Sequence, residues 1–277
     1  MCGQNGGGSF MLVYVICLLI LGLPAMVMEL SVGRAAQTSP LYMYEKLSGK
    51  RKWKIPGIVC LIGNIALIAF YSVVAGWIIY YFVITTPSVN VGYLLITVVI
   101  TFVILSFRLQ GGLERITKYM MSALLVLMLV LAIHSFTLSG AKDGLAFYLI
   151  PDLSKISGTM IVKAMNQAFF TLSVGMGGMA IFGSYIGKER SLLGESVNII
   201  VLDTFVAVVA GMIMFPACDT YNLEVTAGPS LLFDTMASVF NHMQGGRWWG
   251  ALFFLFMVFA AMSTVFGVCE NLLAMIR

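Results

Sequence analysis

The stretch KAMNQAFFTLSVGMGGMAIFGSYIG, residues 163–187, decides the fold of this chain. It is long enough to cross a bilayer, yet its middle holds three glycines within positions 175–178 and is a poor helix former. Backbone that leaves a helix cannot face lipid, because its N–H and C=O groups find no partners there. It is tolerated where it lines a site, as in ion-coupled transporters whose broken helices hold solute and cation. The alternative is an unbroken helix whose glycine-rich face packs against a neighbour.

The composition of the chain indicates an integral membrane protein. Of its 277 residues, 60% are hydrophobic and 10% are charged, whereas a soluble domain carries about 25% charged residues. The apolar runs lack the alternation of a β-barrel, so they predict helices. We therefore expect an all-α, polytopic membrane helix bundle with about seven transmembrane helices, one of them broken. The expected spans are 10–30, 55–84, 91–107, 116–138, 160–186, 194–217 and 247–269.

The basic residues predict the orientation of the chain in the membrane. If residue 1 lies outside, the loops at 31–54, 108–118 and 187–195 and the end at Arg277 face the cytoplasm, and they hold 12 of the 16 Lys and Arg residues. The positive-inside rule therefore favours an outside start and a cytoplasmic end. This bias accounts for the net charge of +4 without a nucleic-acid partner. The cluster at residues 50–54 is interpreted as a topology signal, and a lipid-binding patch is the alternative.

We expect residues 1–277 to form one membrane domain, because no low-complexity linker divides them. Two outer segments differ in character. Residues 139–159 are polar, and residues 218–246 mix polar and apolar residues, which suggests short helices forming a lid or an ordinary ordered loop. An outside start without a leader suggests that a preceding helix is missing.

Acidic residues inside membrane spans are functional candidates, since each costs about 2.5–3.5 kcal/mol at the centre of a span. Glu29 lies near the inner end of the first span, where it could also be a helix-end charge that pairs with Arg34. Asp203 lies ten residues into an apolar span with no basic residue within a turn. It could hold backbone at the glycine break, or it could bind a hard cation through oxygen.

Hydroxyl groups occur near the same features. Thr171 and Ser173 flank the break, and Ser263 and Thr264 lie in the middle of the last span, although such groups usually bond to their own backbone. Tyr71 could donate into a cavity or simply pack. The sequence shows no Ser/His/Asp set, no HExxH motif and no paired carboxylates at useful spacing, so we do not expect an enzyme.

Four motifs together resemble the neurotransmitter:sodium symporter family, in its bacterial amino-acid-transporter branch with the leucine-transporter fold. The resemblance covers about residues 3–273 and implies the family's second to eighth helices, a partial form of its inverted-repeat fold truncated at both ends. The motifs are Asn5-Gly6-Gly7-Gly8-Ser9-Phe10, Glu29-Leu30-Ser31-Val32-Gly33-Arg34, Phe70-Tyr71-Ser72-Val73-Val74-Ala75-Gly76-Trp77 and Gln167-Ala168-Phe169-Phe170-Thr171-Leu172-Ser173-Val174-Gly175.

The resemblance implies roles for individual residues. Glu29 would brace the unwound backbone near Ser173. A first sodium site would use Thr171 and Asp203, and the fixed charge of Asp203 implies that chloride is not required. A second sodium site would use Ala260 through its carbonyl, with Ser263 and Thr264. The substrate pocket would be lined by Leu67, Tyr71, Phe170, Ser173, Met176 and Val268.

The expected function is therefore sodium-coupled symport of a neutral, hydrophobic amino acid across the plasma or inner membrane, carried out by the intact parent protein. Each sodium site is incomplete here, because the family's broken first helix supplies further ligands. The alternatives are a non-transporting membrane fragment or a regulatory partner of a full-length transporter. A channel fits less well, because no span carries a polar stripe. Uncovered apolar faces also make an oligomer a possible state of this chain.

Overall fold

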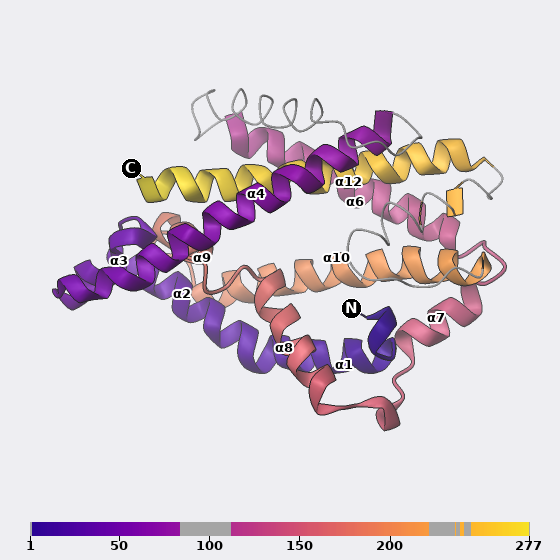
Figure 1. The fold of residues 1–277 in the computed structure, drawn as a ribbon, viewed down its shortest axis with the longest axis horizontal. Helices are drawn as coiled ribbons and strands as arrows, with labels where there is room; N and C mark the ends of the chain where they lie inside the picture. Colours follow the sequence, from indigo (N-terminus) through magenta and orange to yellow (C-terminus); the bar gives the residue numbers. More distant parts are fainter. Residues whose placement is uncertain (1, 84–111, 222–235, 237–238, 241–244, 277) are drawn as a thin grey trace. The chain divides into compact units, whose positions relative to one another are not determined.

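The computed structural model describes residues 2–83, 112–221, 236, 239–240 and 245–276 (Figure 1). Every regular element within these residues is a helix, which confirms the predicted all-α class. The elements are η1 (Gly3–Asn5), α1 (Gly8–Cys17), η2 (Leu18–Gly22), α2 (Leu23–Ala36), α3 (Pro40–Ser48), η3 (Arg51–Lys54), α4 (Ile55–Val83), α6 (Gly112–Ser135), α7 (Ala141–Leu149), η4 (Leu153–Lys155), α8 (Gly158–Thr171), α9 (Gly178–Tyr185), α10 (Leu192–Thr220) and α12 (Gly246–Ile276).

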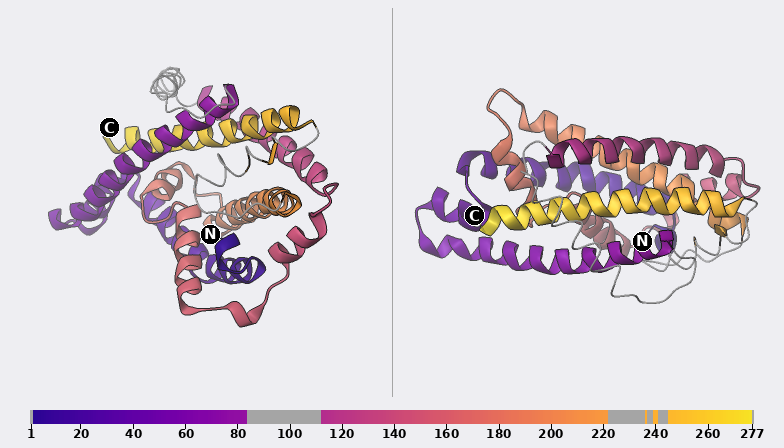
Figure 2. Two further views of the ribbon diagram at one scale, coloured as in Figure 1. Left: turned by 45° about the vertical axis from the view of Figure 1, so that its right-hand side comes forward. Right: turned by 90° about the horizontal axis from the view of Figure 1, so that it is seen from above.

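Four stretches of helix in the described part of the chain are long and apolar enough to cross a membrane: Gly8–Ala36, Arg51–Ile79, Leu192–Thr220 and Gly246–Met275. The chain is therefore an integral membrane protein. The first of these stretches contains a π-helical turn, η2, whereas α12 runs without interruption (Figure 2). The apolar part of α6, Met121–Ser135, is shorter. The predicted span 91–107 and most of the predicted lid, 218–246, lie outside the described residues.

The chain divides into two compact units, and α1, α4, α10 and α12 each contribute to both. The first unit comprises Met1–Met11, Phe70–Ile156 and Val206–Phe266. The second comprises Leu12–Ala69, Ser157–Phe205 and Gly267–Arg277. The expectation of a single domain stays a prediction.

In the first unit, the glycines at the start of α1 allow the backbone to lie directly against α7 and the turn that follows it. Gly7 has φ +55°, and a Cβ there would collide with the carbonyl oxygen of Phe147. A Cβ on Gly8 would lie 2.6 Å from the carbonyl oxygen of Ile150. Side chains are excluded at both positions, so the glycine-rich motif is explained by close backbone approach. The polar outer segment 139–159 contains the helix α7.

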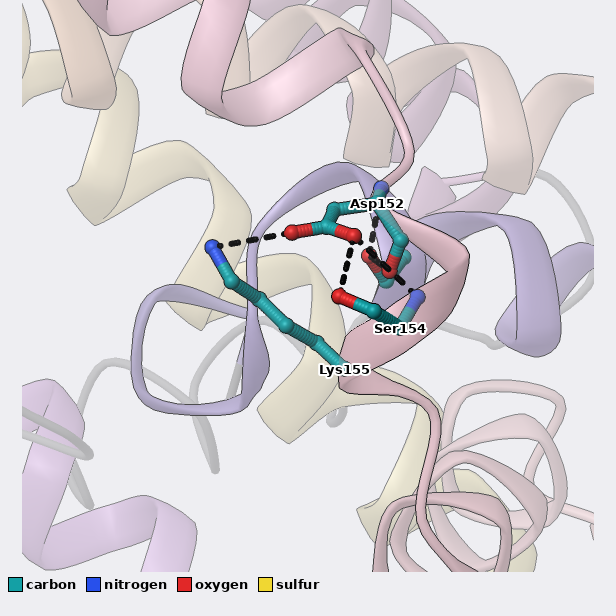
Figure 3. A network of polar contacts seen from close by, with 4 residues as sticks. Asp152, Ser154 and Lys155 are labelled. Carbon is teal, nitrogen blue, oxygen red and sulfur yellow. Dashed lines mark hydrogen bonds and ion pairs between the residues drawn. The ribbon is translucent and has the colours of Figure 1, made fainter.

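A polar network fixes the same contact one residue further along. The buried Ser9 hydroxyl donates to the Asp152 carbonyl at 2.8 Å and accepts from the Asp152 amide at 2.9 Å. The exposed Asp152 carboxylate accepts hydrogen bonds from the hydroxyl and amide of Ser154 and pairs with Lys155 (Figure 3). These contacts, the Ser154 hydroxyl above all, hold the pKa of Asp152 below its ordinary value.

The core of the first unit is formed by apolar side chains of α6, α10 and α12, including Met128, Val209 and Phe253. Two buried polar groups of the same unit are satisfied by backbone carbonyls. Ser135 donates to the carbonyl of Ile213 at 3.0 Å, and Tyr148 of α7 donates to that of Ala207 at 3.2 Å. Such bonds satisfy buried hydroxyls where no water is available.

In the second unit, α2 and α9 lie close together because each presents a glycine to the other. A Cβ on Gly33 would collide with the carbonyl oxygen of Ala180, and a Cβ on Gly183 would collide with that of Leu30. Small residues permit this close approach between membrane helices, where dispersion forces and not water exclusion hold helices together. The contact places α2 beside the helix that follows the glycine-rich stretch.

Candidate functional site

The helix predicted to break does break in the structure. Helix α8 ends at Thr171, α9 begins at Gly178, and residues 172–177 between them form turns (Figure 1). Three residues of this segment, referred to below as the break, have left-handed backbone: Ser173 with φ +51°, Gly175 with φ +89° and Gly177 with φ +78°. Glycine adopts this conformation without steric cost, whereas Ser173 does not. The interruption is therefore encoded in the spacing of the glycines.

Glu29 of α2 contacts the break directly. Its side chain is 8% exposed, and Oε2 accepts a hydrogen bond from the Gly175 amide at 2.7 Å. It also lies beside the first amides of α9, at Met179 and Ala180, where a helix N-terminus favours negative charge. Within the described residues, Oε1 has no hydrogen-bond partner. Glu29 is thus placed where the expected bracing role requires it, and the role itself remains a prediction.

The alternative interpretation of Glu29, as a helix-end charge paired with Arg34, differs from the observed geometry. The Arg34 guanidinium donates to the carbonyl of Arg190 at 2.9 Å and to that of Gly187 at 3.4 Å. Arg190 in turn pairs with Glu195 at 3.0 Å. Arg34 therefore ties the end of α2 to the loop after α9, and Glu29 faces the break.

Asp203 of α10 lies against Thr171, the last residue of α8, which immediately precedes the break. The Thr171 hydroxyl is 3.2 Å from both carboxylate oxygens of Asp203. Within the described residues, the hydrogen bonds that the structure shows for the Asp203 carboxylate are with hydroxyl groups, which differs from the alternative that Asp203 holds the backbone of the break. Two carboxylate oxygens and a hydroxyl oxygen are the type of donor that a hard cation such as sodium prefers. The residues present therefore fit the expected first sodium site.

Tyr14 is a member of this cluster that the sequence did not reveal. It lies in α1, is almost fully buried, and directs its hydroxyl to Oδ2 of Asp203 at 3.5 Å. The only signal was a tyrosine hydroxyl inside an apolar span, the same feature that drew attention to Tyr71. Its partner lies 189 residues away in sequence, so no local pattern could connect the two.

The expected second sodium site lies in α12, in the other unit. Ser263 and Thr264 both donate to the carbonyl oxygen of Ala260, at 2.9 Å and 3.0 Å. These are the local bonds that Ser and Thr commonly make inside helices. Three oxygen atoms are thereby gathered within one helical turn, and the two hydroxyl oxygens retain lone pairs. Their use as cation ligands remains a prediction.

The expected substrate residues divide between the two units. Tyr71 belongs to the first unit, where its ring packs edge-on against Phe70 with centroids 5.6 Å apart. The other five belong to the second unit, together with Thr171 and Asp203. Phe170 is 48% exposed at the end of α8, and the rest are half-buried on α4, in the break and on α12. Those five are Leu67, Phe170, Ser173, Met176 and Val268.

Comparison with known proteins identifies the class to which this fold and site belong. The family model described as the sodium:neurotransmitter symporter family matches residues 1–90 and 84–277. The chain belongs to this family, which consists of transporters and not of enzymes.

Individual relatives and a solved structure agree with this assignment. A sodium-dependent transporter of Haemophilus influenzae is 31% identical, over 99% of this chain and 67% of its own length. The sodium-dependent transporter YhdH of Bacillus subtilis is 30% identical, over 99% of this chain and 66% of its own. The crystal structure of MhsT in complex with L-phenylalanine matches with a TM-score of 0.86 at 34% identity, covering 97% of this chain and 66% of that one. The chain thus spans about two thirds of the length of these proteins.

Proposed function

We propose that the protein carrying this chain is a sodium-coupled symporter of a neutral, hydrophobic amino acid. The observation that carries the proposal is the Asp203–Thr171 contact of 3.2 Å at the end of α8. A carboxylate in an apolar span is costly without a counter-charge, and a sodium ion supplies that charge. The family assignment and the sodium-dependent relatives support the same conclusion.

Coupling follows from the position of this carboxylate. Thr171 is the last residue of α8, and the break begins at Leu172. Sodium bound by Asp203 and Thr171 restrains the end of α8, and this favours one conformation of the break over others. Substrate that binds at the break then meets an ordered backbone, so each ligand raises the affinity of the other.

The proposed substrate class rests on side chains and on a solved relative. Leu67, Phe170, Met176 and Val268 are apolar, and the MhsT structure holds L-phenylalanine. We infer that chloride is not required, because Asp203 already supplies a fixed negative charge beside the cation. We further propose that the protein has two sodium sites. We also propose that residue 1 lies outside the cell and residue 277 in the cytoplasm.

The test is binding of labelled L-phenylalanine, in detergent, to the purified protein that carries this chain, with sodium or choline as the cation and chloride or gluconate as the anion. The proposal predicts saturable binding in sodium, none in choline, and no effect of the anion. Competition by unlabelled leucine, lysine and aspartate defines the class, and leucine alone should compete. Binding that does not depend on sodium, or that is strongest for a charged amino acid, contradicts the proposal.

A further inference from the structure

A pair of buried amide side chains lies next to the break on the side of α4. Asn64 of α4 is 1% exposed, and Asn271 of α12 is 8% exposed. The Asn64 Nδ2 group donates to the Met176 carbonyl at 2.7 Å and to the Cys60 carbonyl at 2.8 Å. The Asn271 Nδ2 group donates to Oδ1 of Asn64 at 2.6 Å. One chain of hydrogen bonds therefore runs from α12 through α4 to the break.

The direction of this chain is fixed by its chemistry. An amide offers donors at nitrogen and acceptors at oxygen. A reversed Asn64 would place Oδ1 against two carbonyl oxygens, so its nitrogen must face them. Oδ1 of Asn64 then needs a donor, which only the nitrogen of Asn271 supplies among the described residues. Each amide orients the next, and the last link is the Met176 carbonyl.

The break is thus held by two kinds of group. Glu29 accepts from the Gly175 amide, and Asn64 donates to the carbonyl of the next residue, Met176. Cys60, one turn before Asn64 on the same face of α4, lies 3.5 Å from the Gly175 carbonyl. Backbone groups freed by the break in a membrane need such partners. The two sides are complementary, because α2 supplies an acceptor and α4 supplies donors.

The C-terminal end of α12 also packs against the break. Met275 is fully buried, and its terminal methyl group lies 3.2 Å from where a Cβ on Gly177 would be. The Asn271 nitrogen lies 3.5 Å from the corresponding position on Gly178. A displacement of this part of α12 therefore alters both the packing and the hydrogen-bond chain at the break.

We propose that Asn64 and Asn271 are positioning residues, which hold the backbone of the break in its binding conformation and couple it to the end of α12. This inference rests on the proposed function only for its effect on amino-acid binding. Its effect on the backbone of the break follows from the geometry alone.

The first test measures the break without any ligand. Amide hydrogen exchange of residues 172–178 is followed by mass spectrometry in Asn64→Leu, Asn271→Leu and the double variant. Asn64→Leu should speed this exchange by about 10-fold, the factor for loss of roughly one hydrogen bond. Asn64→Ser, a smaller change, should act in the same direction. Asn198→Leu, the same substitution at an exposed site on α10, should leave the exchange unchanged.

The double variant separates positioning from simple stabilisation. Each single variant leaves a buried polar atom of its partner unsatisfied, whereas replacing both partners by apolar groups can be nearly neutral for stability. We expect the double variant to recover most of the thermal midpoint lost by the single variants, while exchange at the break stays about 10-fold faster. The proposal is wrong if, in the double variant, exchange at the break returns to the rate of the unmodified chain when the thermal midpoint recovers. It is also wrong if Asn64→Leu does not raise the exchange rate at the break.

The second test connects the pair to binding. In sodium, the affinity of the double variant for L-phenylalanine should be about 10-fold lower than that of the unmodified chain, with the sodium dependence retained. Unchanged affinity overturns the coupling of the pair to the site. If the unmodified chain binds no amino acid, the proposed function fails in this chain, and the exchange measurement still decides whether the pair positions the break.

Discussion

The two candidate cation sites of this chain are built in different ways. The site at Asp203 joins side chains from three helices, and its partners Tyr14 and Thr171 lie 189 and 32 residues away in sequence. The site at Ala260 is contained in five residues of α12. The first exists only when the second unit is folded and α8 ends at the break, whereas the second forms in any α-helix of this sequence. We therefore expect coupling between sodium and substrate to depend chiefly on the first.

The largest expected effect is that of Asp203→Ala. Removing the carboxylate should raise the sodium concentration for half-maximal L-phenylalanine binding by about 100-fold, a loss of about 2.7 kcal/mol, within the range for interactions with a charged group. Asp203→Asn keeps one oxygen and should cost less. The measurement is a sodium titration of binding at fixed amino acid. Equal titrations for Asp203→Ala and the unmodified chain would remove Asp203 from the site.

The next effect concerns the carboxylate that holds the break. Glu29→Ala removes a charge-assisted hydrogen bond to the Gly175 amide and should lower the stability of the second unit by about 1.5–3 kcal/mol. Glu29→Gln keeps an acceptor and should cost less. Thermal unfolding of the purified chain measures both. Binding of L-phenylalanine is measured on the same variants. If Glu29→Ala weakens this binding no more than a substitution at Ser263 does, the conformation of the break is not linked specifically to the first cation site.

Two glycine variants separate backbone strain from packing at the break. Gly175 has φ +89° and nothing within 4 Å of an added Cβ, whereas a Cβ on Gly177, with φ +78°, meets Pro40 at 2.8 Å. Gly175→Ala should therefore cost about 1–2 kcal/mol from strain alone, and Gly177→Ala should cost more. Unfolding midpoints of the two variants give the difference. Equal costs would show that Pro40 moves aside freely.

At the second candidate site we expect small effects on stability. Ser263→Ala and Thr264→Val each remove a bond to the Ala260 carbonyl, which the other hydroxyl still contacts. Because such bonds are local, each variant should change stability by about 0.5 kcal/mol or less, while sodium affinity falls if the site is used. Comparison of unfolding with sodium titration tests this, and a large loss of stability would show that the hydroxyls hold the fold.

The smallest effect is expected away from both sites, at Asp152. Its pKa is lowered, first by the Ser154 hydroxyl, so its contacts stabilise the folded state above the ordinary carboxyl pKa and are lost as the pH falls through the lowered value. Asp152→Asn should therefore be slightly less stable than the unmodified chain near neutral pH, and the difference should shrink as the pH falls below about 4. Thermal unfolding against pH measures it. A difference that grows in acid would contradict the sign.

The comparison also shows what the sequence could reveal. The glycines at 175 and 177 and a carboxylate in an apolar span at 203 are local anomalies, so they could be recognised without a structure. Tyr14, Asn64 and Asn271 are ordinary in their local setting. Asn64 lies 207 residues from Asn271, and its importance appears only when α4, α12 and the break are brought together.

The helix in segment 139–159 is a further feature that the sequence did not reveal. Segment 139–159 was described from the sequence only as polar, and it contains α7. Tertiary contacts stabilise this short helix, because Gly144 lies against the backbone of Phe215 and Tyr148 bonds to Ala207. The local polarity of the segment could not predict these partners.

The most direct test of the account is equilibrium binding of radioactive sodium to the purified chain in chloride-free buffer. The unmodified chain is compared with Asp203→Ala and with the double variant Ser263→Ala, Thr264→Val. We expect Asp203→Ala to abolish the sodium binding that L-phenylalanine enhances, whereas the α12 variant should retain this enhancement at lower total binding. Enhancement that survives Asp203→Ala and is lost in the α12 variant would contradict the assignment of coupling to the break.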